Sequence, residues 1–511
     1  MKNDNSNIYK STIFRGISLN YLHLLLTGAS LIVLTPIMLE YLGKSGYGLW
    51  SAFIGVIGYF GLLNFGFQTA TAKYTAEYTA LKNFDYLSKI ISTILVLFIF
   101  ISLIISLFTV GFSSYVVSLL NAPSDLVWQG QIAFILLGLA VAVRISGSVV
   151  GNVIYGHERV ALLKGFGIIQ IASNFTLTII FLMTGLGLIG VGLAFLTSLI
   201  ILTFLYVIHL NRANYIEKIN PKLYSYTTLK EIAPYSLRSF ILNLTSRILY
   251  QTDNIVIAIF KGPASVSSYA VAYNLMFNMT YLASVISETI FPRFSSLYAL
   301  QDRNTLRSIF LETTKLSAGI GSIIALFLLL EGTHFLNLWV GESNTVDNVT
   351  LTMFALMSIL HTSFTPAGLM LQGIGENKGF TISESINAIL NIILSIILIM
   401  NYGVWGVAAA TLISHIITST WVVPLLASKH IGLPITEYIA QGIAKPTLLI
   451  LPTLLTRQLL NTILPIANIF AEIAVSFCTI AFIYVPLFYI FALTNQERIK
   501  YKEYVSTLIK K

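Results

Sequence analysis

Charged residues are scarce in this chain of 511 residues, where Asp, Glu, Lys and Arg together make up 10% of the sequence. Soluble globular domains contain about 25% charged residues, so the composition excludes an ordinary soluble protein. The longest polar interruption, at about 211–234, is too short to form a separate soluble domain with its own core. We therefore expect a protein that is built almost entirely from membrane-embedded segments.

Cysteine is almost absent, since Cys478 is the single one and lies within an apolar run. One cysteine cannot form an internal disulfide, and no Cys/His cluster has the spacing of a metal site. The sequence also has neither a GxxxxGK[ST] phosphate-binding loop nor a GxSxG nucleophile motif. These absences favour a protein that is not an enzyme and that needs no cofactor or metal.

Hydrophobic sequence is abundant instead, at 56% of the residues. Apolar stretches of about 18 residues or more recur along the chain, and each can cross a hydrocarbon core about 30 Å thick as an α-helix. The first stretch is too long for a signal peptide, so we expect it to remain as a membrane span. The pattern predicts an all-α, polytopic membrane protein with about fourteen transmembrane helices, at 17–39, 47–70, 90–111, 130–154, 163–185, 189–210, 236–260, 266–291, 309–331, 349–373, 379–400, 404–427, 441–461 and 468–493.

The cations follow these segments in an alternating pattern. Of the 30 Lys and Arg residues, 25 fall in the two tails and the even-numbered loops or their helix ends, and only Lys44 and Lys261 fall in odd-numbered loops. Cytoplasmic loops retain Lys and Arg, so both termini are predicted to be cytoplasmic. The net charge of +9 is spread over short loops, which indicates contact with anionic lipid headgroups rather than with nucleic acid. Arg144, Arg247 and Arg457 lie within apolar segments.

The second half of the chain repeats features of the first half at offsets of 214–221 residues. Gly165-Phe166, for example, recurs as Gly379-Phe380. Six spans per repeat leave both copies with the same orientation, as in transporters built from two parallel lobes around a central site. We therefore predict an N-terminal lobe at 1–215, a C-terminal lobe at 216–430, and two additional helices with a cytoplasmic tail at 431–511.

Polar residues within the spans are the candidates for substrate binding. An Arg at the centre of a span costs at least about 2.5 kcal/mol, so Arg144 and Arg247 need a partner or water. On a helix, Arg247 shares one polar arc with several neighbours. The predicted substrate-binding residues are Arg144, Arg247, Asn243, Tyr250, Gln251 and Asn254. Structural pairing, for example of Arg247 with Asp253, is the alternative that remains open. Arg457 is expected to extend to the interface.

Two further sets of residues have weaker signals. Arg15, Lys73, Arg238 and Arg293 stand at cytoplasmic helix ends, where they could capture a phosphorylated headgroup or only anchor the helices in lipid. Asp253, Glu288 and His361 are candidates for ion coupling, although a single His on an apolar helix is more often a packing residue. Glu384 and Glu472 lie near helix ends, from which they could reach the interface.

Four short motifs carry a resemblance to a known family. They are YLGKSGYGLW at 41–50, LNFGFQTA at 63–70, DNIVIAIFKG at 253–262 and SYAVAY at 268–273. With them the chain resembles the O-antigen and capsule flippases of the multidrug/oligosaccharidyl-lipid/polysaccharide (MOP) exporter superfamily, across essentially its whole length. The resemblance implies a MATE-like fold in the bacterial inner membrane. It also implies translocation of undecaprenyl-diphosphate-linked oligosaccharide repeats by alternating access.

The partners that the resemblance implies are the lipid-linked oligosaccharide, membrane lipids and other membrane proteins of polysaccharide assembly. Two other functions remain as alternatives. A proton- or sodium-coupled multidrug or small-cation antiporter would favour an acidic, aromatic cavity, which the central cations oppose. A membrane polysaccharide polymerase or ligase would need catalytic groups on large outer loops, and the odd-numbered loops are short.

Overall fold

The computed structural model describes residues 2–157, 159–213, 219–463 and 468–509, and the regular secondary structure within these ranges is entirely helical. Eleven helices among these residues are long and apolar enough to cross a membrane. The chain is therefore an all-α, multi-pass membrane protein. It divides into two compact units, an N-terminal unit of residues 1–267 and a C-terminal unit of residues 268–511. The predicted lobe boundaries at 215 and 430 stay a prediction.

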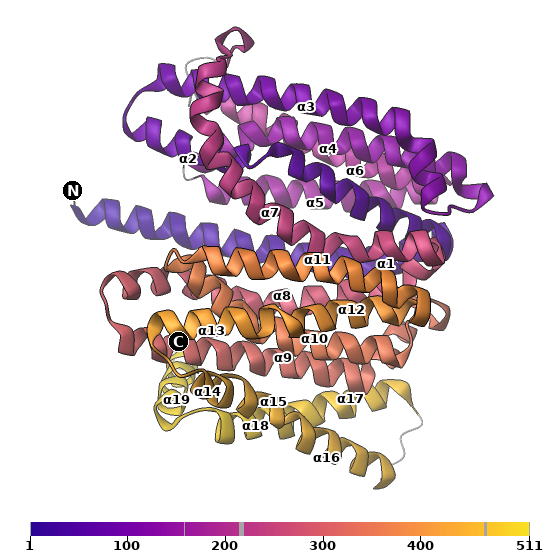
Figure 1. Ribbon diagram of the computed structural model, residues 1–511, viewed down its shortest axis with the longest axis vertical. Helices are drawn as coiled ribbons and strands as arrows, with labels where there is room; N and C mark the ends of the chain where they lie inside the picture. Colours follow the sequence, from indigo (N-terminus) through magenta and orange to yellow (C-terminus); the bar gives the residue numbers. More distant parts are fainter. Residues whose placement is uncertain (1, 158, 214–218, 464–467, 510–511) are drawn as a thin grey trace. The chain divides into compact units, whose positions relative to one another are not determined.

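The N-terminal unit consists of long helices that run alongside one another (Figure 1). Within it, α4 packs against α3 and α6, and α5 packs against α1 and α6. Helix α7 packs against α1, α2 and α3. The bounds are α1 Lys2–Phe60, the 3-10 helix η1 Gly61–Asn64, α2 Phe67–Ala80, α3 Phe84–Leu119, α4 Val127–Gly156, α5 Val160–Met183, α6 Gly187–Ala213, α7 Tyr226–Lys261 and the first turn of α8 Pro263–Ala299.

Helix α1 contains two helical segments, which correspond to the first predicted span and most of the second. The join is a kink at Gly43, whose backbone has φ 66° and ψ 175°. Only glycine adopts such angles readily, because it has no Cβ. The connection expected around Lys44 is therefore this kink, where two helical segments meet.

The break between α1 and α2 falls within the LNFGFQTA motif. Phe65 and Gly66 both have positive φ, at 46° and 76°. The side chain of Asn64 stabilises this turn, because its Nδ2 donates to the Gly61 carbonyl at 2.7 Å and its Oδ1 accepts from the Gly66 N–H at 2.8 Å. A Cβ at Gly66 would lie 2.1 Å from the carbonyl oxygen of Ser236 on α7. The motif thus encodes a tight turn against α7.

The C-terminal unit contains the remainder of α8 and all later helices (Figure 1). Helix α9 packs against α10, and α11 packs against α12 and α13. The last two predicted spans pack against α9 through the π-helix η5, α15, α16 and α17. The bounds are α9 Arg303–Val340, α10 Asn348–Gly373, α11 Asn377–Tyr402, α12 Val404–Ile417, α13 Ser419–Ile431, α14 Ile435–Glu437, η5 Tyr438–Ala444, α15 Lys445–Leu448, α16 Ile450–Ile463, α17 Ile469–Thr479, η6 Ile480–Tyr484, α18 Val485–Leu487, η7 Phe488–Ala492 and α19 Asn495–Ile509.

The helix starts of the two units repeat along the chain. Helices α3, α4, α5 and α6 begin at residues 84, 127, 160 and 187, and α9, α10, α11 and α12 begin at 303, 348, 377 and 404. Each pair of starts is 217 to 221 residues apart. The same four-helix succession therefore occurs twice, at the spacing of the sequence motifs.

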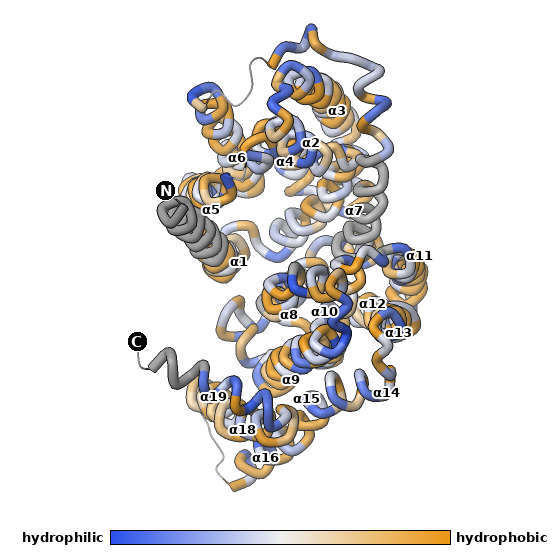
Figure 2. Tube along the Cα trace, turned by 90° about the vertical axis from the view of Figure 1, so that its left-hand side faces the viewer, coloured by the Kyte–Doolittle hydropathy of each residue, from blue (hydrophilic) through white to orange (hydrophobic). Residues whose placement is uncertain are grey.

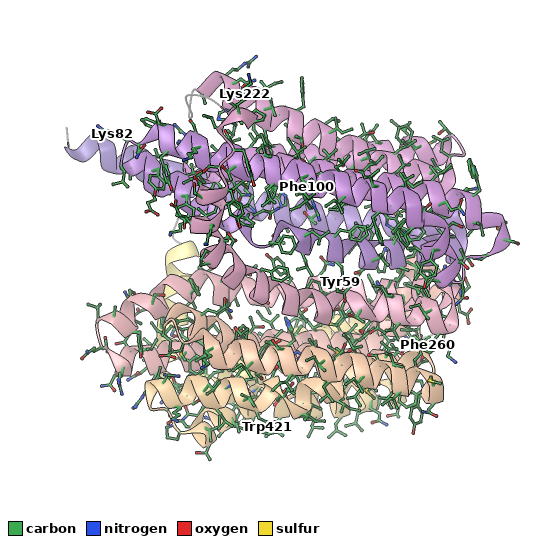
Figure 3. All side chains as sticks on the ribbon, turned by 45° about the horizontal axis from the view of Figure 1, so that its top comes forward. Tyr59, Lys82, Phe100, Lys222, Phe260 and Trp421 are labelled. Carbon is green, nitrogen blue, oxygen red and sulfur yellow. The ribbon has the colours of Figure 1, made fainter. Side chains whose placement is uncertain are left out.

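The outer faces of the helices are apolar. On α3, the side chains of Ile99, Phe100, Leu103 and Leu107 are all exposed. Figure 2 colours α3 mostly as hydrophobic, and Figure 3 shows Phe100 on its outer side. Large exposed apolar patches are unfavourable in water, so these faces are the surfaces that contact lipid.

Arg457 does not extend to the interface, contrary to the expectation from its position near a helix end. Only 2% of its side chain is exposed, and its Nη2 lies 3.7 Å from Glu331 Oε1 and 3.6 Å from Glu472 Oε1. Its Nε donates to Ser476 Oγ at 2.6 Å. The side chain is long enough to reach lipid headgroups, but two carboxylates on neighbouring helices hold it inside the bundle.

The C-terminal helix α19 is attached to α9 by ion pairs. Lys315 Nζ lies 2.7 Å from Glu497 Oε2, with 2% of the Lys315 side chain exposed, and Lys500 Nζ lies 2.8 Å from Glu312 Oε1. Glu497 also accepts from the backbone N–H of Thr494, as in a capping box. Burial raises the pKa of Glu497, but the hydrogen bond from Lys315, the Thr494 N–H and the charge of Lys315 outweigh burial and hold the pKa below its usual value.

Replacing Lys315 with Met should release α19 from α9. The substitution leaves Glu497 without its buried cation, and removing one partner of a buried pair is strongly destabilising. A loss of about 1.4 kcal/mol corresponds to a tenfold change in the docking equilibrium, so we expect chymotrypsin to cut after Tyr501 about ten times faster. Lys429→Met, which removes an exposed lysine of α13, should leave the cleavage rate unchanged. Equal rates for Lys315→Met and the unmodified protein would contradict the docking role.

Candidate functional site

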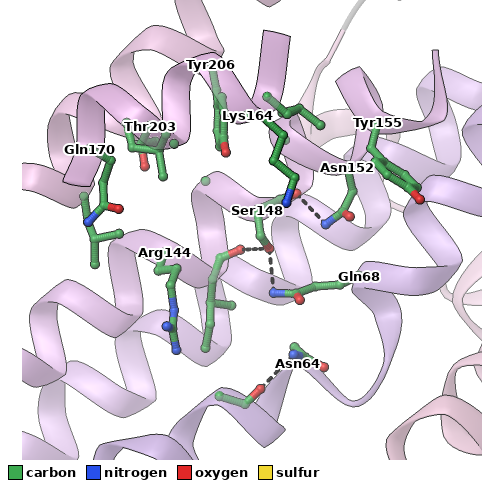
Figure 4. A pocket seen from close by; sticks show the side chains of 18 of the residues that line it. Asn64, Gln68, Arg144, Ser148, Asn152, Tyr155, Lys164, Gln170, Thr203 and Tyr206 are labelled. Atoms are coloured by element: carbon green, nitrogen blue, oxygen red, sulfur yellow. Dashed lines mark hydrogen bonds between the residues drawn. The ribbon is translucent and has the colours of Figure 1, made fainter. Parts of the chain in front are cut away.

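A cavity of about 540 Å³ lies inside the N-terminal unit, between α1, α2, α4, α5 and α6. Figure 4 shows ten labelled side chains around it. Its volume falls within the range of about 300–1,000 Å³ that is typical of ligand sites. The lining residues are His23, Gly61, Asn64, Gln68, Arg144, Ile145, Gly147, Ser148, Gly151, Asn152, Tyr155, Val160, Leu163, Lys164, Gly167, Gln170, Leu199, Leu202, Thr203 and Tyr206.

Helical spacing explains how the polar residues of α4 reach the cavity. Arg144, Ser148, Asn152 and Tyr155 are four, four and three residues apart, so they occupy one face of the helix. Small residues on the same face allow α6 to approach closely. A Cβ at Gly151, for example, would lie 2.9 Å from the ring of Tyr206. The sequence of α4 thus combines one polar stripe with room for its neighbour.

Arg144 is the predicted substrate-binding residue that the structure places in the cavity. Its side chain is exposed, and it extends toward η1, where a Cβ at Gly61 would lie 3.5 Å from Arg144 Nη2. An arginine near the middle of a membrane helix is thereby kept away from lipid. An arginine in the middle of an apolar span needs polar surroundings, and for this reason the sequence alone indicates Arg144 as a candidate.

Lys164 on α5 is a second cation in the cavity, and it is not among the substrate-binding residues predicted from the sequence (Figure 4). Its position near the start of the fifth predicted span indicates only a topological role. Among the described residues that line the cavity, none is Asp or Glu. Two cations in such a lining favour a positive potential, which attracts anionic ligands.

Uncharged hydrogen-bonding groups complete the cavity. Gln68 Nε2 donates to Ser148 Oγ at 3.0 Å, and Asn152 Nδ2 donates to the Ser148 carbonyl at 2.8 Å (Figure 4). Gln170 Nε2 donates to Ser198 Oγ at 3.2 Å. These bonds connect α2 to α4 and α5 to α6, so the amide side chains are held in place before a ligand arrives.

The polar arc of α7 lies largely outside the described side chains. The expectations for Arg15, Arg238, Asn243, Arg247, Tyr250 and Gln251 concern side chains that the structure does not describe, and they stay predictions. Asp253 and Asn254 are described and do not line the cavity. Thr252 hydrogen-bonds with the hydroxyl group of Tyr59, which connects this end of α7 to α1.

The remaining predicted residues lie at separate places. Lys73 is 3.6 Å from Glu77 and lies 4.4 Å above the ring of Tyr74, so its charge is already partly balanced. Arg293 and Glu288 are exposed on α8. His361 lies on α10, close enough to His415 on α12 for an electrostatic interaction. Neither the headgroup-entrance role nor the ion-coupling role is tested by these positions.

A buried polar cluster lies on one face of α11 in the C-terminal unit. Ser419 donates to Glu384, of which only 9% is exposed, so Glu384 does not reach the interface as its sequence position suggested. Asn391 Nδ2 donates to Thr411 Oγ1 at 2.8 Å. Among the described residues, the amide group of Asn387 is fully buried and has no hydrogen-bond partner. The interior of this unit thus holds one carboxyl group and two amide groups of α11.

Comparison with known proteins identifies the family. The model of the polysaccharide biosynthesis protein family matches residues 13–298, which is more than half of the chain. The chain belongs to this family. A Shigella flexneri protein named as an O-antigen transporter is 23% identical to this family member over 386 residues, which cover 72% of the chain and 86% of the relative.

Solved structures of the MOP superfamily share the fold of this family member. The lipid II flippase MurJ in an inward closed conformation matches with a TM-score of 0.74 at 18% identity, over 95% of the chain and all of MurJ. An inward-facing multidrug resistance MATE transporter matches with a TM-score of 0.69 at 17% identity, over 79% of the chain and 94% of the transporter. The MOP-type fold that the sequence motifs predict is therefore confirmed.

Proposed function

We propose that the protein is a flippase that moves oligosaccharide repeats linked to undecaprenyl diphosphate across the bacterial cytoplasmic membrane. The repeats would serve O-antigen, capsule or exopolysaccharide synthesis, and both termini of the flippase face the cytoplasm. The observation that carries this proposal is the cavity in which Arg144 and Lys164 stand without an acidic residue in the lining. Family membership and the Shigella relative support the polysaccharide substrate.

The physical problem for such a substrate is its diphosphate group. A charged group cannot enter hydrocarbon without replacement of its water. Arg144 can bind phosphate oxygens with two parallel hydrogen bonds, and Lys164 can supply a second positive charge. The amide and hydroxyl groups of Gln68, Asn152 and Thr203 suit sugar hydroxyls. The polyprenyl chain would stay in the lipid, next to the apolar faces of the helices.

Alternating access would move the bound headgroup between the two membrane faces. Duplicated transporters of this kind open a central site first to one side and then to the other. Ion coupling is a further part of the proposal, with His361 and the buried polar cluster around Glu384 as its candidate site. Arg247 stays a candidate for a second contact with the headgroup.

Export of small cations is the second candidate function, because a MATE multidrug transporter shares the fold. Cationic drugs would be repelled by Arg144 and Lys164, and the described lining of the cavity holds no acidic group to attract them. The chemistry of the cavity therefore favours the anionic sugar lipid over a cationic drug.

Leaflet inversion in proteoliposomes tests the proposal. The protein is reconstituted with a fluorescent undecaprenyl-diphosphate oligosaccharide, and a membrane-impermeant quencher reports the fraction that has crossed the bilayer. We expect protein-dependent inversion of this lipid and no uptake of the cationic dye rhodamine 6G by the same vesicles. Dye uptake without lipid inversion would overturn the proposal and favour the cation exporter.

A further inference from the structure

A partly buried group of charged side chains lies in the C-terminal unit, where α9 meets α16 and α17. Glu331 and His334 belong to α9, Arg457 to α16, and Glu472 and Ser476 to α17. Only 2% of the side chains of Glu331 and Arg457 is exposed. None of these residues lines the cavity of the N-terminal unit, so the proposed flippase function leaves them unexplained. We refer to these five residues as the α9–α17 cluster.

Each carboxylate of the cluster presents its two oxygens to different groups. Oε1 of Glu331 and Oε1 of Glu472 face Arg457 Nη2, at 3.7 and 3.6 Å. Oε2 of Glu331 and Oε2 of Glu472 face His334 Nδ1, at 3.2 and 3.7 Å. Ser476 accepts from Arg457 and donates to Glu331. Two carboxylates therefore share one permanent cation and one imidazole.

The charges of the cluster do not balance while His334 is neutral. Two carboxylates carry two negative charges, and Arg457 supplies only one positive charge. The distances to Arg457 also exceed the 2.7–2.9 Å of close charge-assisted hydrogen bonds. An uncompensated charge in a buried site is unfavourable. One additional positive charge at His334 would make the cluster neutral.

The chemistry of imidazole shows where this charge would reside. Carboxylates only accept hydrogen bonds, so the Nδ1 atom that faces them carries a hydrogen. An added proton then binds to Nε2, and the positive charge is shared over the ring beside both carboxylates. Imidazole is the side chain whose charge ordinarily changes between pH 5 and 8.

A second cavity gives His334 access to protons. It has a volume of about 330 Å³ and is lined by Leu328, Leu329, Leu330, Thr333, His334, Asn348, Leu351 and Thr352. His334 has 38% of its side chain exposed and is the only one of these lining residues that ionises. The charged groups that face it are Glu331 from its own helix and Glu472 from α17, with Arg457 of α16 behind them.

We propose that the α9–α17 cluster is a proton-binding site, in which His334 takes up one proton between Glu331 and Glu472. The bound proton strengthens the attachment of α16 and α17 to α9, because it completes the charge balance at the place where the three helices meet. The last two spans are thus held to the C-terminal unit by a contact whose strength depends on pH. The predicted topology places this end of α9 on the outer side of the membrane.

Thermal unfolding of the purified full-length protein in detergent tests the site. The melting temperature is measured at pH 5.5 and at pH 8.0 for the unmodified protein and for His334→Gln, which retains a donor but cannot become charged. Two carboxylates lie beside His334 in the folded site, so the proposed site binds the proton more tightly than the unfolded chain does, and the stabilisation is present at low pH and lost as the pH rises. We expect the melting temperature of the unmodified protein to exceed that of His334→Gln at pH 5.5. This excess should be about 2–4 °C larger at pH 5.5 than at pH 8.0.

Two further variants make the result specific. His430→Gln removes a histidine that lies 3.9 Å from Glu376 in the same unit, and it should retain most of the pH-dependent difference. Glu472→Gln removes one negative charge from the cluster and should abolish the extra stabilisation at pH 5.5. This variant tests the site even if His334→Gln accumulates poorly. The same pH dependence in the unmodified protein, His334→Gln and Glu472→Gln would overturn the proposal and leave the cluster as a fixed ion pair.

Discussion

Replacing Arg144 with alanine should reduce export of the surface polysaccharide at least about tenfold, while the amount of protein in the membrane stays unchanged. A hydrogen bond to a charged group is worth about 1.5–3 kcal/mol, and 1.4 kcal/mol corresponds to a factor of ten. Arg144 faces a cavity rather than a close-packed neighbour, so its removal should weaken the binding of the diphosphate without opening a void in the core. Surface polysaccharide and membrane-embedded protein are measured in the same cells.

Two substitutions show whether the effect belongs to this guanidinium group. Arg144→Lys keeps the charge but loses the two parallel hydrogen bonds, so export should fall to an intermediate level. Arg212→Ala removes an exposed cation at the end of α6, outside the cavity, and should leave export intact. Normal export by Arg144→Ala would remove Arg144 from the site, and the proposed function would then need another cationic group.

Replacing Gly66 with alanine should prevent the protein from accumulating. Gly66 has a φ of 76°, and its Cβ would lie 2.1 Å from the carbonyl oxygen of Ser236. Left-handed backbone costs about 1–2 kcal/mol in a residue with a Cβ, and overpacking adds about 1–3 kcal/mol. The sum of about 2–5 kcal/mol is a large fraction of the roughly 5–15 kcal/mol that stabilises a native protein. Protein in the membrane and the melting temperature in detergent are the measurements.

Gly111→Ala is the matched control for this prediction. A Cβ at Gly111 on α3 meets no atom within 4 Å, and alanine is a better helix former than glycine by about 1 kcal/mol. The variant should accumulate at least as well as the unmodified protein. If Gly66→Ala accumulated as well as Gly111→Ala, the turn between α1 and α2 would not require glycine at that position.

The helical spans were the part of the fold most easily predicted from sequence. The segment predicted at 90–111 lies within α3, and the one predicted at 163–185 lies almost entirely within α5. The hydrophobic thickness of a bilayer sets the length of a span, so the length and composition of each run are sufficient to predict it. The connection predicted around Lys44 is a kink at Gly43, where the backbone is not helical and two helical segments meet.

The sequence by itself also indicated Arg144, since an arginine in the middle of an apolar segment is costly in lipid wherever the helix packs. Only the tertiary structure decided that Lys164 lies in the same cavity and that Arg457 is buried between Glu331 and Glu472. Position along a helix tells how deep a charge lies in the membrane. The groups that surround that charge belong to other helices, far away in the chain, and the packing of those helices depends on contacts along their whole length.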